Sequence, residues 1–153
     1  MAKKAKKKTA IISNRRARYD YELADSLIAG ISLTGRETKS LRLGHGHLRG
    51  AYVTARNGEL WLINATITSA NGYTITPEDQ TRPRKLLVKK RELAALLKSK
   101  DEGKTLVPLE LLTKSRYIKL RLSIGKGKKR YDKRQSIKKR EEARQTAREL
   151  KSR

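Results

Sequence analysis

The sequence contains no cysteine, only one tryptophan and only three prolines. Without cysteine the chain has neither a disulfide nor a thiolate zinc site. No apolar run approaches the ~20 residues of a membrane span, and no apolar segment follows the basic N-terminus, as a signal peptide would require. We therefore expect a soluble cytoplasmic protein. Its 153 residues suit one domain of about a hundred residues plus tails.

Acidic residues are scarce, with 15 Asp and Glu against 39 Lys and Arg, and the formal net charge is +24. A charge of this size attracts polyanions and speeds association with them, so nucleic acid and anionic membrane are the two candidate partners. A helix on a membrane surface needs a broad apolar face. The C-terminal end offers only Ile137, Ala143, Ala147 and Leu150, so the charge pattern favours nucleic acid.

The positive charge is concentrated at the two ends of the chain. Residues 1–18 contain eight Lys and Arg and no acid, and residues 126–153 contain 13 Lys and Arg against 4 Asp and Glu. We expect residues 1–10 to be a basic disordered arm and residues 125–153 to be a basic tail. Because the tail has too little apolar surface to offset its conformational entropy, it should be disordered when free. The domain is expected over 11–124.

Two segments carry helix signals. Thr34 and Glu37 match a capping box and Gly44 is a stop signal, so we expect a helix over about 35–43. Three leucines share one face of a second helix expected over about 89–100.

Strand signals occupy most of the remaining chain. Asn57-Gly58 tolerates the positive φ angles of a type I′ turn, so residues 51–67 predict a β-hairpin. Pro108 cannot donate a ladder hydrogen bond and is expected at an edge or a bulge. Further strands are expected over 19–33 with breaks at Asp25 and Gly30, over 104–113 and over 116–124, with a polar loop over 68–85. About six strands with two or three helices predict a small, mainly β, α+β domain. Closure into a barrel would remove its exposed edges.

Catalytic and metal-binding patterns are weak. Gly103-Lys104-Thr105 resembles the end of a phosphate-binding loop, but Lys98 stands where that motif needs its first glycine. His45 and His47 are the only histidines, and they lack a third metal ligand nearby. No nucleophile–base triad or apolar-flanked carboxylate pair is present. The sequence therefore indicates no enzyme, no metal and no cofactor.

The basic clusters are the remaining candidates for function. Residues 14–21, NRRARYDY, combine three arginines, an amide and two tyrosines. Guanidinium groups match phosphate, and Arg and Tyr planes stack on unpaired bases. A solvated arm leading into a strand is the alternative. This cluster gives Asn14, Arg15, Arg16, Arg18 and Tyr19 as RNA-binding candidates. A second cluster of Arg82, Arg84 and Lys85 gives Arg84 and Lys85 as candidates, where a solvated loop explains the sequence equally well.

Six motifs occur in a fixed order: NRRARYDY at 14–21, LTGRETKSLR at 33–42, GELWLINATI at 58–67, RPRKLL at 82–87, GKTLVPL at 103–109 and GKGKKRYDKR at 125–134. With these motifs, over about residues 11–140, the chain closely resembles the bacterial SmpB family, the partners of transfer-messenger RNA. No single motif would make the resemblance specific, but their order does.

The resemblance implies an oligonucleotide-binding type of β-barrel with helices packed on it, and no enzymatic activity. It implies binding to the tRNA-like domain of transfer-messenger RNA and delivery of that RNA to stalled ribosomes for trans-translation. The partners would be this RNA, the decoding region of the small ribosomal subunit and, indirectly, elongation factor Tu through the aminoacylated RNA. The protein would be a monomer without a membrane partner.

Residue by residue, the resemblance ties Asn14, Arg15, Lys39, Arg42, Leu86 and Lys119 to RNA binding. It places Tyr131, Asp132, Lys133 and Arg134 at the decoding region, and the stretch that follows in the empty mRNA channel, as a helix. Just before them, Lys126, Lys128, Lys129 and Arg130 are spaced to contact successive phosphates. We expect Gly125 and Gly127 to give the chain an unusual exit angle from the barrel.

Three positions depart from the family pattern. Ile28 stands where many relatives have an acidic residue implicated in RNA binding, and Tyr19 and Tyr131 stand where relatives often have histidine. An aromatic plane remains at the two tyrosines, but an imidazole contact is lost. Two other classes of function compete with the adaptor. A structural ribosomal protein would have similar composition but not these motifs, and an RNA nuclease would need a catalytic constellation.

Overall fold

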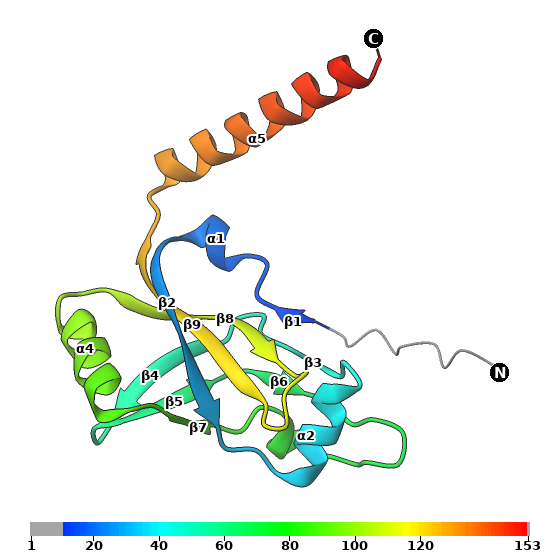
Figure 1. Ribbon diagram of the computed structural model, residues 1–153, viewed down its shortest axis with the longest axis vertical. Coiled ribbons are helices and arrows are strands. Elements are labelled where there is room, and N and C mark those ends of the chain that lie inside the picture. Colours follow the sequence, from blue (N-terminus) through cyan, green and yellow to red (C-terminus); the bar gives the residue numbers. More distant parts are fainter. Residues whose placement is uncertain (1–10, 153) are drawn as a thin grey trace.

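The computed structural model describes residues 11–152, so the basic arm expected over 1–10 lies outside the described residues (Figure 1). The described chain forms nine strands and five helices, mainly β as expected. They are, in order, β1 (Ile12–Ser13), α1 (Ala17–Asp20), β2 (Tyr21–Ile31), α2 (Gly35–Arg42), β3 (Gly46–His47), β4 (Tyr52–Arg56), β5 (Glu59–Ile63), β6 (Thr66–Ile67), α3 (Pro77–Gln80), β7 (Arg84–Leu87), α4 (Lys90–Asp101), β8 (Thr105–Leu112), β9 (Lys119–Gly127) and α5 (Arg130–Lys151).

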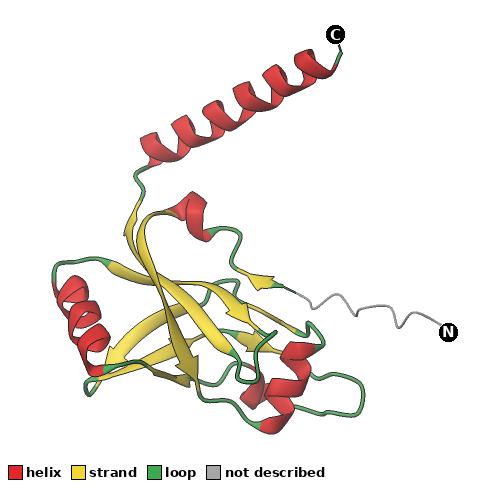
Figure 2. Cartoon of the chain, viewed as in Figure 1, coloured by secondary structure: helices red, strands yellow, loops and turns green. Residues whose placement is uncertain are grey.

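Six antiparallel strands close on themselves in the order β8-β4-β5-β7-β2-β9, and the β8–β9 pairing completes the ring (Figure 2). We call these six strands the strand ring. β1 adds to β8 through Ile12 opposite Leu111, and β3 pairs with β6 in a separate two-stranded sheet. The expected closure of the sheet is confirmed, and it leaves few backbone groups on open edges.

The core lies inside the strand ring. Alternate residues point inward, so Leu60 and Leu62 of β5 and Leu120 and Leu122 of β9 are almost completely buried. Helices close the two ends, with α2 at one and α4 at the other (Figure 1). α2 contributes Leu41 to the core, and α4 contributes Leu96.

The predictions that depend on residues close together in the sequence are confirmed. The amide of Glu37 donates to the Thr34 hydroxyl at 3.3 Å and the Glu37 carboxylate accepts from the Thr34 amide at 2.9 Å, which forms the capping box of α2. Asn57 and Gly58 have φ angles of 52° and 72° in the β4–β5 turn. The ladder between β8 and β9 shifts register just after Pro108, so this proline lies at the expected bulge.

Three expectations about elements are wrong. β2 runs unbroken for 11 residues, because the irregularity at Ala24 and Asp25 is a bulge rather than a break. There the carbonyls of both residues lie within hydrogen-bond distance of the buried hydroxyl of Ser123, at 2.9 and 3.1 Å. Tyr19 lies in α1 rather than in a strand. The polar loop expected over 68–85 contains α3 and the first residues of β7.

The tail begins differently from the expectation. β9 continues to Gly127, where it faces Tyr21 of β2. Neither Gly125 nor Gly127 has a positive φ angle, so the unusual exit angle is not observed. Gly125 is required for close packing instead, because a Cβ there would lie 3.1 Å from Tyr21 Cβ and from Val107 Cγ2.

α5 is a single helix of 22 residues that projects away from the strand ring (Figure 1). None of its side chains is buried. Asp132 lies in its first turn and accepts a hydrogen bond from the Lys129 amide at 3.3 Å, as a helix start requires. That the tail is disordered when free and becomes helical against RNA stays a prediction. Among the described residues no helix combines the length and apolar character that spanning a membrane requires.

Candidate nucleic-acid interface

The NRRAR segment is a rigidly anchored turn between β1 and β2. Ile12, just before the segment, and Ala17, within it, are buried. Asn14 is fixed twice, since its amide donates to the Leu109 carbonyl at 2.7 Å and its side chain to the Pro108 carbonyl at 3.1 Å. These anchors leave the side chains of Arg15, Arg16 and Arg18 exposed on the surface. The anchors therefore present three guanidinium groups to solvent from a fixed backbone.

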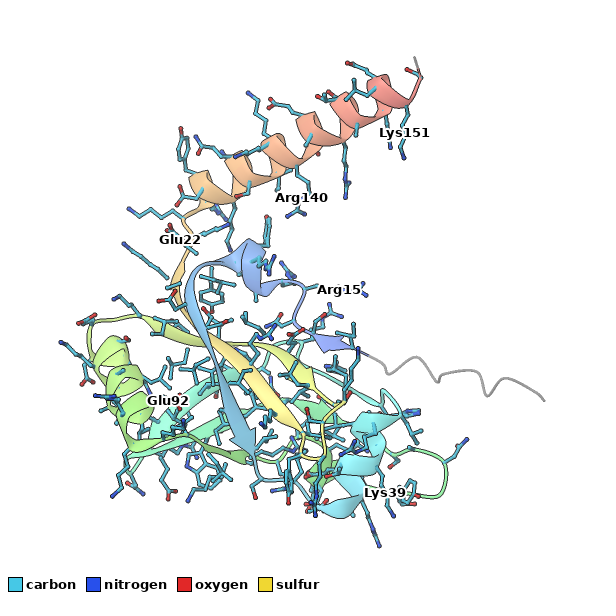
Figure 3. The ribbon with its side chains drawn as sticks, viewed as in Figure 1. Arg15, Glu22, Lys39, Glu92, Arg140 and Lys151 are labelled. Carbon is cyan, nitrogen blue, oxygen red and sulfur yellow. The ribbon has the colours of Figure 1, made fainter. Side chains whose placement is uncertain are left out.

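The beginning of α5 meets this segment. Two cations lie near the ring of Tyr19, with Arg16 at 5.9 Å and Lys133 at 5.6 Å from the ring centre. Lys133 also pairs with Asp20 at 3.3 Å, and the Lys128 ammonium donates to the Arg18 carbonyl at 2.9 Å. The N-terminal and C-terminal basic clusters, which are over a hundred residues apart in sequence, are therefore one continuous surface (Figure 3). We call this surface the α1–α5 junction.

A second surface lies on the outside of β2, β7 and β9. Lys119 is exposed on β9 and faces Gly30 of β2 across the ladder. Gly30 also faces Leu87 of β7, whose side chain covers the place where a Cβ of Gly30 would be. Leu87 and Ile28 are 56% and 47% exposed. An apolar strip with a lysine at its border can hold a base or ribose against Leu87 while Lys119 reaches the phosphate.

The sequence predicts no role for Leu87, and at Ile28 it shows only a departure from the family pattern. A signal for Leu87 was present, since strand alternation places neighbouring residues on opposite faces. Leu86 is buried and therefore Leu87 points outward. The signal was missed because a polar loop was expected up to residue 85 and no strand was predicted for the two leucines that follow.

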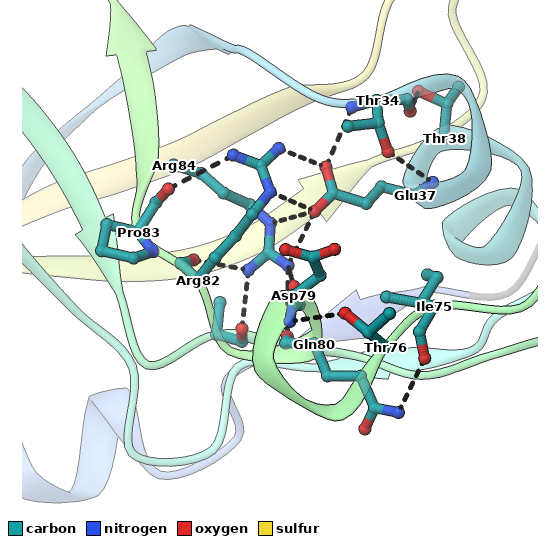
Figure 4. A network of polar contacts seen from close by, with 11 residues as sticks. Thr34, Glu37, Thr38, Ile75, Thr76, Asp79, Gln80, Arg82, Pro83 and Arg84 are labelled. Atoms are coloured by element: carbon teal, nitrogen blue, oxygen red, sulfur yellow. Dashed lines mark hydrogen bonds and ion pairs between the residues drawn. The ribbon is translucent and has the colours of Figure 1, made fainter.

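Two predicted RNA-binding residues are corrected by the structure. Leu86 belongs to the core, at 3% exposure, and Arg84 is completely buried, so neither side chain is available to RNA. Arg84 instead donates to the Glu37 carboxylate at 3.0 and 3.1 Å and to four backbone carbonyls between 2.8 and 3.1 Å (Figure 4). The sequence predicts a surface position for Arg84 because this arginine follows a polar segment. Its buried carboxylate partner, Glu37, is 47 residues away in sequence.

Glu37 joins both arginines of the RPR segment. Arg82 donates to its two oxygens at 2.8 and 2.7 Å. Burial raises the pKa of Glu37, but the hydrogen bonds from Arg82 and Thr34 and the charge of Arg84 together bring that pKa below its usual value. Burial lowers the pKa of Arg84, although the neighbouring Glu37 carboxylate opposes this. The network is structural and ties α2 to the segment between α3 and β7.

Of the other predicted RNA-binding residues, some are free to bind an anion and some already have partners within the fold. Arg42 is half-buried and donates to the carbonyls of Thr113, Ser115 and Arg116 at 2.7 to 3.1 Å, so its guanidinium holds the β8–β9 turn. Lys39 is exposed and lies 4.6 Å from the ring centre of Tyr73. Lys85 pairs with Glu59 at 2.6 Å on the outside of the strand ring. Lys39 therefore stays available to an anion, while Arg42 and Lys85 already have partners.

The tail residues divide between the end of β9, the connection and the first turn of α5. Lys126, Lys129, Arg130, Tyr131 and Arg134 are exposed. The Tyr131 hydroxyl accepts from the Gln135 amide at 2.8 Å and its ring is 68% exposed. An exposed ring among cations suits stacking on an unpaired base.

The Gly103-Lys104-Thr105 segment has a structural role rather than the role of a phosphate-binding loop. Gly103, with a φ of 82°, ends α4, and Lys104 pairs with Glu102 at 2.9 Å. Within residues 11–152 no group of three or more His, Cys, Asp or Glu side chains is arranged to hold a metal ion.

Comparison with known proteins supplies a family for this geometry. Residues 11–152 match the family model described as SmpB protein. The SsrA-binding protein of Trichormus variabilis is 42% identical over 155 residues, covering 99% of each chain. That of Carboxydothermus hydrogenoformans is 44% identical over 144 residues, covering 94% of this chain and 97% of the relative. A solved structure described as "tmRNA-SmpB: a journey to the center of the bacterial ribosome" contains a chain with 38% identity and a TM-score of 0.65. The match covers 83% of this chain and 94% of that one.

Proposed function

Because this chain belongs to the SmpB family, we propose that it is an RNA-binding adaptor rather than an enzyme. It binds the tRNA-like domain of transfer-messenger RNA and delivers this RNA to stalled bacterial ribosomes for trans-translation. The observation that carries the proposal is that relatives named SsrA-binding protein align with 93–99% of this chain. The family model covers residues 11–152, which include α5.

The geometry supports a division of labour between two surfaces. The outer face of β2, β7 and β9 offers Lys119 beside the exposed apolar strip, and it lies on the rigid strand ring. This surface suits stable binding of the transfer-messenger RNA. The α1–α5 junction and α5 carry exposed cations and Tyr131 on a projecting helix, which suits contact with ribosomal RNA. Asn14, Arg42, Arg84 and Leu86 support these surfaces from within.

Three further parts of the proposal rest on family membership. The tail orders fully only against ribosomal RNA, in the decoding region and the empty mRNA channel. The aminoacylated RNA links the protein indirectly to elongation factor Tu. The protein acts as a monomer in the cytoplasm, where the ribosomes are found.

A binding titration tests the proposal. We expect the purified chain to shift labelled transfer-messenger RNA in a gel, with log affinity falling steeply with log salt because each neutralised phosphate releases counterions. It should also restore peptide tagging in a reconstituted translation reaction on an mRNA without a stop codon. A chain that binds this RNA no better than an unrelated structured RNA, or that stays on every ribosome through a high-salt wash, would contradict the adaptor function.

A further inference from the structure

A broad cleft of the described chain separates two parts of the surface that are distant in the sequence. One wall is made by β1, α1 and the start of β2, and the other by the segment 47–53 that enters β4. Its volume is about 1000 Å³, at the upper end of the ~300–1,000 Å³ typical of ligand pockets. Such a cleft is too large for a single ion and suits a short stretch of polymer.

Each wall contains a four-residue turn with an arginine at its second position. In the first, the Ala17 amide donates to the Asn14 carbonyl at 3.3 Å, with Arg15 at the second position. In the other, the Ala51 amide donates to the Leu48 carbonyl at 3.0 Å, with Arg49 at the second position. Both turns are anchored, since Ala17 is 3% exposed and Leu48 is completely buried.

The second turn has additional supports. Gly50 has a φ of 73°, a conformation that favours glycine at the third position of a turn. Its carbonyl accepts from the Asn64 side chain at 3.2 Å. The backbone that carries Arg49 is therefore held in place before any ligand arrives, which reduces the entropic cost of binding.

The electrostatics of the cleft favour an anion. Three arginines line it: Arg15, Arg16 and Arg49. Within residues 11–152, neither Arg15 nor Arg49 makes an ion pair or a side-chain hydrogen bond. The one acidic lining residue, Asp20, already pairs with Lys133 at 3.3 Å and with Arg16 at 3.8 Å.

Two aromatic side chains complete the lining. Tyr52 is 47% exposed at the start of β4, and Tyr21 is half-buried at the start of β2. A ring beside free guanidinium groups suits an unpaired nucleotide, whose base can stack while its phosphates are neutralised. A duplex keeps its bases stacked inside and would leave Tyr52 unused.

We propose that this cleft binds a short unpaired segment of RNA, with Arg15 and Arg49 contacting its phosphates from opposite walls and Tyr52 stacking on a base. The inference rests on the proposed function and deepens it. It extends the binding surface from the NRRAR segment to residues 47–52. The segment could belong to transfer-messenger RNA or to small-subunit ribosomal RNA, and both are tested.

The first experiment compares Arg49→Ala with Arg56→Ala, an exposed arginine at the end of β4 that does not line the cleft. Affinity for a transfer-messenger RNA transcript and for isolated small ribosomal subunits is measured at several salt concentrations. For one of the two RNAs, Arg49→Ala and Arg15→Ala should each weaken binding about fivefold or more and lower the salt slope by about 0.7, the value for one phosphate of a single strand. Arg56→Ala should change neither quantity.

Substitution of Tyr52 should change the affinity but not the salt dependence of binding. Tyr52→Phe should bind like the parent, whereas Tyr52→Ala should lose at least about fivefold in affinity for the same RNA with an unchanged salt slope, because stacking releases no phosphate counterions. Thermal unfolding of each variant shows whether the fold is retained. If Arg49→Ala matches Arg56→Ala on both RNAs, the cleft is not a binding site, even when Arg15→Ala weakens binding.

A second measurement locates the RNA. Because the chain has no cysteine, single cysteines at Ser13 and His47, on opposite walls, can each carry a photo-crosslinker. Both should mark the same short run of unpaired nucleotides, and a cysteine at Arg56 should not. Separate, non-overlapping nucleotides would overturn the proposal. A parent chain that binds neither RNA would instead overturn the proposed function, so the two failures are distinguishable.

Discussion

Glu37 is a single carboxylate that receives two guanidinium groups inside the fold. It is 1% exposed, and its partners Arg84 and Arg82 are 0% and 31% exposed. Removing one member of a buried ion pair leaves an uncompensated charge, which usually costs about 3–5 kcal/mol. The carbonyls around Arg84 satisfy its remaining donors, but they cannot replace the negative charge. The network should therefore be sensitive to loss of that charge and tolerant of changes on the surface.

We predict that Glu37→Gln lowers the free energy of unfolding by about 3 kcal/mol at neutral pH. The matched control is Glu59→Gln, which breaks the exposed pair with Lys85 and should cost less than about 1 kcal/mol. Urea unfolding followed by circular dichroism measures both. Equal effects for the two variants would show that the buried network contributes little.

The same carboxylate makes stability depend on pH. The pKa of Glu37 lies below its usual value in the folded chain, so the stability it contributes is complete above the unfolded pKa of about 4.3 and is lost as the pH falls through the folded pKa. We predict a steep loss of parental stability below about pH 4.3 and a shallower loss for Glu37→Gln. Parallel curves for the parent and the variant over that range would contradict the assignment.

Gly125 and Gly127 look equivalent in the sequence but differ in their surroundings. A Cβ at Gly125 would lie within 3.1 Å of two neighbours, whereas nothing lies within 4 Å of one at Gly127. We predict that Gly125→Ala costs about 1–3 kcal/mol through overpacking. Gly127→Ala should be neutral or stabilise by up to about 1 kcal/mol, because its φ angle suits alanine. Thermal melts of the two variants give the comparison, and a destabilising Gly127→Ala would restore the idea of a special exit angle.

At the scale of elements, the sequence predicts the helix ends and turns whose conformation depends on residues close together in the chain. The capping box of α2 and the Asn57-Gly58 turn depend on groups within a few positions, and both are confirmed. β7 and the unbroken β2 depend on partners far along the chain. Ser123 stabilises the bulge of β2 from about a hundred residues away, and Glu37 holds Arg84 inside. For the same reason the exposed cations of the candidate site could be predicted, but the burial of Arg84 and Leu86 could not.

The α1–α5 junction is the contact that orients the tail helix. Lys133 pairs with Asp20 and lies over Tyr19, and the Lys128 amide donates to the Asp20 carbonyl at 2.9 Å. The Lys133–Asp20 pair is about one-third exposed on both sides, so it contributes at most about 1 kcal/mol and is weakened by salt. Such a contact biases the direction of α5 without fixing it, and an RNA phosphate that binds Lys133 would compete with Asp20.

We predict that Asp20→Asn broadens the orientation of α5. Cysteines introduced at Arg56 and Arg144 would carry the only two spin labels in a chain without cysteine. Their distance distribution should be narrower in the parent at low salt than in Asp20→Asn, and added salt should broaden only the parent. Glu22→Gln, which changes a nearby carboxylate with no ion pair among the described residues, serves as control. Identical distributions for the parent and Asp20→Asn would show that the junction does not orient the helix.

At the scale of the whole molecule, burial and charge are separated in space. The strand ring holds the core, and α5 has no buried residue in 22 positions. The ring can therefore fold without the tail, and the tail can change its conformation without disturbing the ring. A truncation that tests this must follow Gly127, because β9 pairs with β2 up to that residue. A chain ending there should keep binding to transfer-messenger RNA within about tenfold of the parent, a difference of ~1.4 kcal/mol.

The tail should be required after the RNA has reached the ribosome. Ile137 lies in α5, is 38% exposed and is not part of the core, so Ile137→Pro breaks the helix at a cost of about 3 kcal/mol while leaving the ring intact. Ile137→Ala preserves the helix and is the control. Replacing Asp132, Lys133 and Arg134 together by alanine removes the first-turn contacts as well. We predict that Ile137→Pro and the triple variant bind transfer-messenger RNA like the parent but do not support tagging on an mRNA without a stop codon, whereas Ile137→Ala supports it. If Ile137→Pro tags as well as the parent, the helix is not needed on the ribosome, and the tail acts only as a flexible row of cations.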